Sequence, residues 1–108
     1  MVEISITSAD VYLTDKEGHF LYNSITGKNL YKNVYYIRIH GKQRFYAVED
    51  RKIIQVLEIS IHKYRLMARK CGGQLSIRGD NMQFDHYASA KEFYDLLTPW
   101  ITMALIKH

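Results

Sequence analysis

The chain has 108 residues, of which 47% are apolar, 24% are charged and 13% are aromatic. These proportions are those of an ordinary globular domain, and they exclude a collagen, a disulfide scaffold, a long coiled coil and a mostly disordered tail. No internal repeat, low-complexity stretch or linker divides the sequence. We therefore predict a single domain over residues 1–108.

Charge is unevenly distributed along the chain, whose formal net charge is +4. Residues 28–78 include twelve basic and three acidic side chains, a charge of +9, while the remainder has three basic and eight acidic ones, a charge of −5. Such a layout attracts an anionic partner to one side of a protein. The alternative is that these charges only keep helix and hairpin faces solvated.

Cysteine usage and hydropathy indicate the compartment. The single cysteine, Cys71, excludes an intramolecular disulfide, which suits a reducing environment. Residues 1–5 lack the basic start and apolar run of a signal peptide. The most apolar segment, 96–106, has 11 residues, whereas about 20 are needed to span a bilayer. We expect a cytoplasmic protein with no membrane contact.

The N-terminal part of the chain has the pattern of short strands. Apolar and polar residues alternate over 2–6 and again, with shifted parity, over 9–13. The shift predicts a break or bulge near Thr7 and Ser8. Turns, with a short strand between them, are expected before residue 30.

The clearest hairpin joins residues 34–40 to residues 43–48 through a type II′ turn at Gly41–Lys42. One face of this hairpin, which includes Ile37 and Ile39, is the more apolar and is the predicted core face. The opposite face combines rings with basic side chains, and Lys42 extends it at the tip like a wing.

A long helix is predicted over residues 51–71. Apolar or small residues recur there at spacings of three and four, and Asp50 is the expected N-cap. Basic residues near its C-terminal end suit the helix dipole, and Gly72 can terminate it. A strand within residues 53–61 remains the alternative.

A second hairpin and a second helix complete the chain. The hairpin joins residues 74–78 to residues 82–87, and Ser89 with Glu92 forms a capping box for the helix. Pro99 predicts a kink, or a stop and restart, in that helix. The expected fold class is α+β: an antiparallel sheet of five to seven short strands and hairpins, with two main helices packed on one face.

The sequence gives little sign of catalysis or metal binding. No histidine pair has the spacing of metal ligands, and Cys71 at a helix end is best interpreted as a buried structural residue. Asp80, Asp85 and His86 are close in sequence, but general acid–base chemistry needs convergence on a substrate that spacing alone does not show. We predict no catalytic residue, no metal and no cofactor.

The basic and aromatic surface is the most informative feature, because rings stack on bases and basic groups meet phosphates. The predicted nucleic-acid-binding residues on the first hairpin and the long helix are Tyr36, Arg38, Lys42, Phe45, Lys63, Arg65, Arg69 and Lys70. The alternative is that Tyr36 and Phe45 pack under a neighbouring segment, with a purely structural role.

Three functions follow from these features. The first is a small, non-enzymatic nucleic-acid-binding or regulatory protein. The second is a protein-interaction module, such as an inhibitor or assembly adaptor, that turns the same basic face to an acidic partner. The third is a small enzyme. In addition, the C-terminal helix is apolar on nearly every side, which predicts a homodimer interface or burial of these residues in the core. Its predicted interface residues are Trp100, Met103, Leu105 and Ile106.

Overall fold

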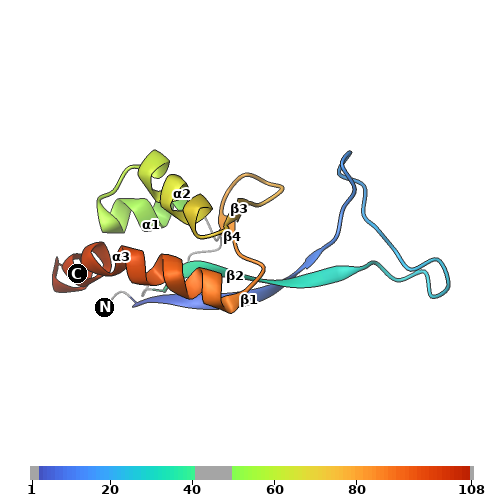
Figure 1. Ribbon diagram of the computed structural model, residues 1–108, viewed down its shortest axis with the longest axis horizontal. Coiled ribbons are helices and arrows are strands. Elements are labelled where there is room, and N and C mark those ends of the chain that lie inside the picture. The colour runs from blue at the N-terminus through green and yellow to red at the C-terminus, as the bar shows by residue number, and fades with distance from the viewer. Residues whose placement is uncertain (1–2, 41–49, 108) are drawn as a thin grey trace.

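A computed structural model describes residues 3–40 and 50–107. In that part of the chain, four strands and three helices form an α+β fold, which confirms the predicted class (Figure 1). Three helices stand where two were expected. The elements are β1 (Glu3–Tyr12), β2 (Tyr31–His40), α1 (Asp50–Leu57), α2 (Ile61–Lys70), β3 (Gln74–Leu75), β4 (Met82–Gln83) and α3 (Tyr87–Lys107).

Strands β1 and β2 form one long antiparallel ribbon. Their pairing runs without interruption from Glu3–His40 to Tyr12–Tyr31, so the predicted break or bulge is wrong. The alternation of apolar and polar residues shifts between 2–6 and 9–13 for another reason. The face of the twisted ribbon that is buried is not the same along its whole length. Ile37 and Ile39 are buried in the main core, as predicted, whereas Val34 is buried on the opposite face.

The helices form the remaining layers of the fold. Helix α3 packs against both strands, α1 packs against β2 and α3, and α2 lies on α1 and α3 as an outer layer (Figure 1). Aromatic rings join these layers: Phe93 of α3 contacts Tyr64 of α2 at 5.0 Å and Phe84 at 5.4 Å between ring centroids. All three rings are fully buried, so they anchor the core.

The predicted long helix is two helices. Glu58 has a φ of 56°, outside the helical region, and α2 begins after it with Ser60 as N-cap, whose hydroxyl accepts a hydrogen bond from Lys63 N–H. The alternative of a strand within residues 53–61 is wrong as well, because these residues belong to α1, to the turn after it and to the start of α2. Asp50 is the first residue of α1, and its carboxylate accepts a hydrogen bond from Met82 N–H.

The C-terminal elements differ in length from those expected. The second hairpin is confirmed, but its strands are only two residues each. Helix α3 begins at Tyr87 rather than after Ser89 and continues through Pro99, so the predicted stop and restart is wrong. Pro99 cannot donate the backbone hydrogen bond of its position, but the core contacts along the buried side of α3 stabilise the helix on both sides of it.

An arm, defined here as residues 12–31, projects from the end of the ribbon (Figure 1). It ends in two small hairpins, closed by the bridges Thr14–Phe20 and Tyr22–Asn29. The molecule measures 53 × 30 × 22 Å, and its radius of gyration of 15.2 Å exceeds the roughly 13 Å expected of a compact chain of this length. The arm therefore stands away from the core.

The first predicted hairpin is only partly covered by the described residues. Its first strand is β2, whose partner is β1 on one edge and, through Tyr35, Phe84 on the other. Its turn and second strand, residues 41–48, lie outside the described residues.

Candidate nucleic-acid interface

The candidate interface comprises α1, the turn after it, and α2. The two helices have eight and ten residues, and only Glu58, Ile59 and Ser60 separate them. The N–H of Ile59 donates to the carbonyl of Ile54 at 3.2 Å, and Glu58 takes the left-handed conformation that glycine often supplies in such turns. The three-residue connection has the length found between the helices of a helix-turn-helix.

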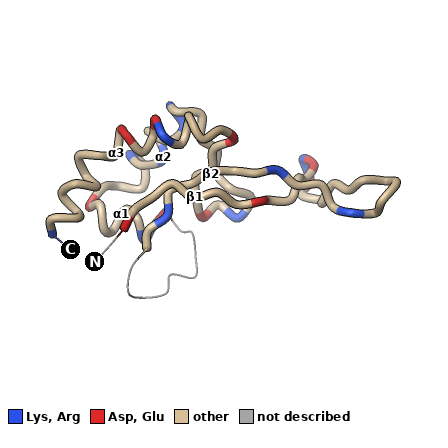
Figure 2. Tube along the Cα trace, turned by 90° about the horizontal axis from the view of Figure 1, so that it is seen from below, with Lys and Arg blue, Asp and Glu red and all other residues tan. Residues whose placement is uncertain are grey.

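Helix α2 has one buried side and one basic side. Tyr64 and Ala68 are buried against the core. The outward side exposes His62, Lys63, Leu66, Arg69 and Lys70. Helix α2 contains four Lys and Arg residues and no acidic residue, and Figure 2 shows the basic positions along it. Exposed cations without nearby acids on the same helix produce a positive surface.

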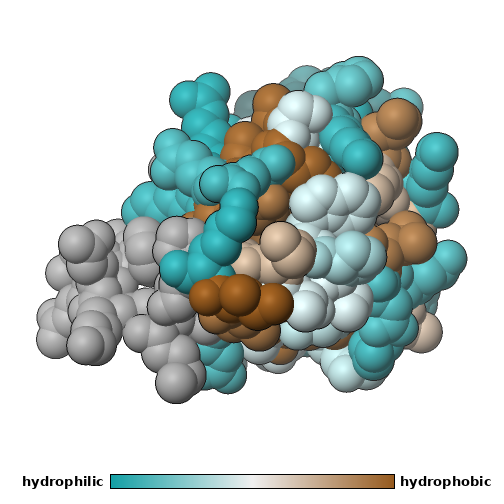
Figure 3. Space-filling model, turned by 90° about the vertical axis from the view of Figure 1, so that its left-hand side faces the viewer, coloured by the Kyte–Doolittle hydropathy of each residue, from teal (hydrophilic) through white to brown (hydrophobic). Residues whose placement is uncertain are grey.

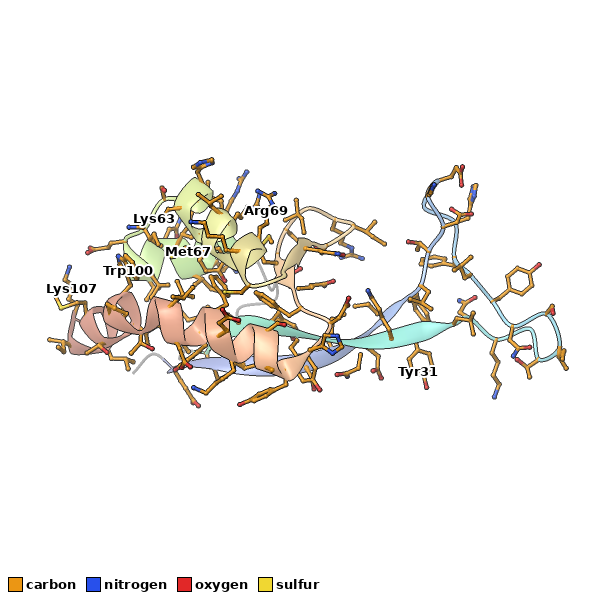
Figure 4. All side chains as sticks on the ribbon, in the orientation of Figure 1. Tyr31, Lys63, Met67, Arg69, Trp100 and Lys107 are labelled. Atoms are coloured by element: carbon orange, nitrogen blue, oxygen red, sulfur yellow. The ribbon has the colours of Figure 1, made fainter. Side chains whose placement is uncertain are left out.

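Three of the predicted contact residues are exposed as expected. Arg69 and Lys70 are exposed in the last turn of α2. Lys63 is exposed too, and its Nζ lies 4.5 Å from the centre of the half-buried Trp100 ring (Figure 4). This cation–π contact holds Lys63 on the side of α2 that faces α3.

Arg65 does not belong to the exposed set, contrary to the prediction. Its Nη2 donates to the carbonyl of Gly79 at 3.1 Å, and its Nε lies 3.5 Å from Oδ2 of Asp50. Only 24% of the side chain is exposed. The guanidinium therefore connects α2 to α1 and to the β3–β4 loop.

Asp50 of α1 is the buried partner of Arg65 in this connection. Burial raises the pKa of its carboxyl from 3.8 to about 6, because the Met82 N–H and the Arg65 charge compensate only part of the lost hydration. The N–H of Asp50 also donates to the carbonyl of Asp80. Sequence analysis missed this pair, since nothing local relates residues 50 and 65.

The β3–β4 hairpin lies beside α2 and contributes further exposed residues. Ser76 N–H donates to Asn81 carbonyl, and the Ser76 hydroxyl donates to Asp80, so the loop has a defined shape. Ile77 and Arg78 are exposed in this loop. Through Arg65 and Gly79 the loop has a fixed place next to α2, which adds Arg78 to the candidate interface.

The residues predicted on the first hairpin are not gathered into an exposed surface. Tyr36 is only 6% exposed, so its interpretation as an open stacking ring is wrong, and for this residue the packed alternative is confirmed. The physical reason is that both faces of the ribbon are covered over this stretch. Arg38 is half-buried. Lys42 and Phe45 lie outside the described residues.

Cys71 and one cluster of polar side chains on the arm have simple structural explanations. Cys71 is buried at the end of α2, where burial and then Glu92 raise the pKa of its thiol. Ligand atoms of Asp15, Glu17 and His19 lie within 4.8 Å of one another on the arm. The Asp15 carboxylate there accepts hydrogen bonds from the N–H groups of Glu17 and His19, which makes it a turn residue.

The predicted dimer residues lie at the end of α3. Met103, Leu105 and Ile106 are 49–75% exposed, and Figure 3 views this end of the molecule, where apolar side chains interrupt a polar surface. None of the described helices is long and apolar enough to cross a membrane. No family model, curated protein or solved structure matches the chain.

Proposed function

We propose that this protein is a non-enzymatic binder of double-stranded DNA and that α2 is its recognition helix. The observation that carries the proposal is the α1–turn–α2 unit, in which the second helix has an exposed basic side and no acidic residue. In helix-turn-helix proteins the second helix lies in the major groove and the first crosses the backbone. The one cysteine is buried, and we assign the function to the cytoplasm.

The dimensions of α2 fit this role. Ten helical residues are about 15 Å long, and a helix fits into the major groove, which is about 12 Å wide. His62 and Leu66, near the start and middle of the exposed side, would reach base edges. Arg69 and Lys70, in the last turn, would meet phosphates, as would Arg78 of the adjacent hairpin loop.

Titration of labelled nucleic acids, followed by fluorescence polarisation, tests the proposal. Duplex DNA, single-stranded DNA and double-stranded RNA are compared at about 50 and about 200 mM salt, because each phosphate contact makes binding more sensitive to salt. The expected result is preference for duplex DNA and steep weakening with salt.

Two double variants locate the surface. In Arg69→Ala/Lys70→Ala, affinity falls and the salt slope decreases by about two, one for each lost phosphate contact. The matched control, Lys32→Ala/Lys91→Ala, removes the same charge from exposed positions of β2 and α3 and leaves binding close to that of the unmodified protein. Equal losses in both variants would show a general charge effect and contradict the assignment of α2.

A protein-interaction module is the second candidate function. It is favoured by the arm, where large apolar side chains are exposed. Alternatively, such a module would bind an acidic protein through the same basic residues of α2. Failure of every nucleic acid to bind at low salt would favour this candidate.

A further inference from the structure

We propose that the arm is a self-association surface, through which two copies of this chain pair about a twofold axis. This inference concerns a part of the molecule that the DNA-binding proposal does not use. It rests on the apolar area of the arm, on its defined shape and on the distribution of its charges.

The arm exposes more apolar surface than an isolated projection needs. Seven large side chains within these twenty residues are 39–92% exposed: Tyr12, Phe20, Leu21, Tyr22, Ile25, Leu30 and Tyr31. At roughly 100 Å² each, and summed over all sides of the arm, they expose about 700 Å² in total, against the roughly 800 Å² that each partner contributes to a standard interface.

Backbone hydrogen bonds give the arm a defined shape. The N–H of Leu13 donates to Leu30, that of Leu30 to Leu21, and that of Leu21 to Leu13, each at 2.9 Å, so three segments meet at one junction. Tyr12 and Phe20 pack edge to face with ring centroids 5.5 Å apart. An arm built in this way presents its apolar groups with little ordering left to occur on binding.

Charge complementarity identifies a second copy as the occupant. The first small hairpin of the arm, residues 14–20, contains Asp15, Lys16 and Glu17 and has a net charge of −1. The second, residues 22–29, contains Lys28 and has a net charge of +1. When two arms lie antiparallel, the first hairpin of one copy meets the second hairpin of the other, and opposite charges face each other in both places. A polyanion has no such match, because the whole arm is neutral.

Sedimentation velocity without nucleic acid tests the proposal separately from DNA binding. The unmodified protein is measured from about 1 to about 100 µM, and we expect a species of twice the chain mass of 12.7 kDa that dissociates on dilution. A monomer at every concentration would overturn the proposal.

Apolar variants then locate the interface. Tyr22→Ser/Ile25→Ser should raise the dimer dissociation constant at least tenfold, and both side chains are exposed enough for the fold to survive their removal, which circular dichroism checks. The matched control Met103→Ser/Ile106→Ser, at the end of α3, should leave the constant within twofold. The reverse pattern would assign the interface to α3 and refute the role of the arm.

A charge exchange tests the antiparallel pairing itself. Lys28→Glu makes both hairpins of the arm negative, and we expect the dissociation constant to rise several-fold. Adding Glu17→Lys gives the first hairpin +1 and the second −1, so the complementary pattern returns with its signs exchanged. The double variant should dimerise like the unmodified protein. Additive weakening in the double variant would refute the pairing.

Discussion

Replacement of the buried Asp50 by asparagine should change how stability depends on pH. The carboxyl has a pKa of about 6 in the folded protein and 3.8 as its ordinary value, because burial removes its hydration. A difference of roughly two pKa units corresponds to about 3 kcal/mol between the protonated and ionised forms. The ion pair with Arg65, at 3.5 Å, leaves this cost largely uncompensated.

Proton linkage gives the direction in which stability changes with pH. Below pH 3.8 the carboxyl is protonated in both folded and unfolded states and carries no cost. As the pH rises from 3.8 to about 6, the unfolded chain loses its proton first, so the stability of the folded state falls. Above pH 6 the folded state bears the full cost of about 3 kcal/mol. Asp50→Asn removes this titration, so the variant should gain stability relative to the unmodified protein as the pH rises.

Urea unfolding between pH 4 and pH 7.5, followed by the fluorescence of Trp100, the single tryptophan, measures the effect. The attraction between the ionised carboxylate and Arg65 is already part of the pKa of about 6, so the difference in pH slope between the variant and the unmodified protein is the readout. Asp15→Asn is the control for removal of a carboxyl. Backbone hydrogen bonding by His19 lowers the pKa of the Asp15 carboxyl below 3.8, so its titration is nearly over by pH 4 and the stability of that variant should run parallel to that of the unmodified protein from pH 4 to pH 7.5. Parallel pH profiles for Asp50→Asn and the unmodified protein would refute the reasoning.

Three further substitutions test the packing and the turn by urea unfolding. Gly73→Ala should destabilise the protein by about 1–3 kcal/mol, since its Cβ would lie 2.9 Å from the carbonyl oxygen of Ala68; an unchanged midpoint would contradict this close approach. Glu58→Gly should raise the free energy of unfolding by less than about 1 kcal/mol, because the relief of a φ of 56° is partly offset by loss of the exposed ion pair with Lys107, whereas Gln55→Gly, inside α1, should lower it by about 1 kcal/mol. Phe93→Ala should cost about 3–5 kcal/mol, and a loss below 1 kcal/mol would show that the ring does not anchor the core.

Local sequence patterns determined the element types. Period-two alternation identified β1 and β2, and spacings of three and four identified the helical segments, because each pattern repeats with the geometry of its own backbone. The second hairpin was correctly placed by its turn residues, and Lys63, Arg69 and Lys70 were correctly assigned to an exposed helix side by the same periodicity.

Only the tertiary structure decided which of these residues are available to a partner. Arg65 shares the basic run of α2 yet is held by Asp50 and Gly79, groups 15 and 14 positions away. Tyr36 is buried because both faces of the ribbon are covered over this stretch, which local sequence periodicity does not reveal. The arm was predicted only as turns with a short strand between them. Its three-way junction joins Leu13, Leu21 and Leu30 across the chain, and such contacts depend on which segments meet in space.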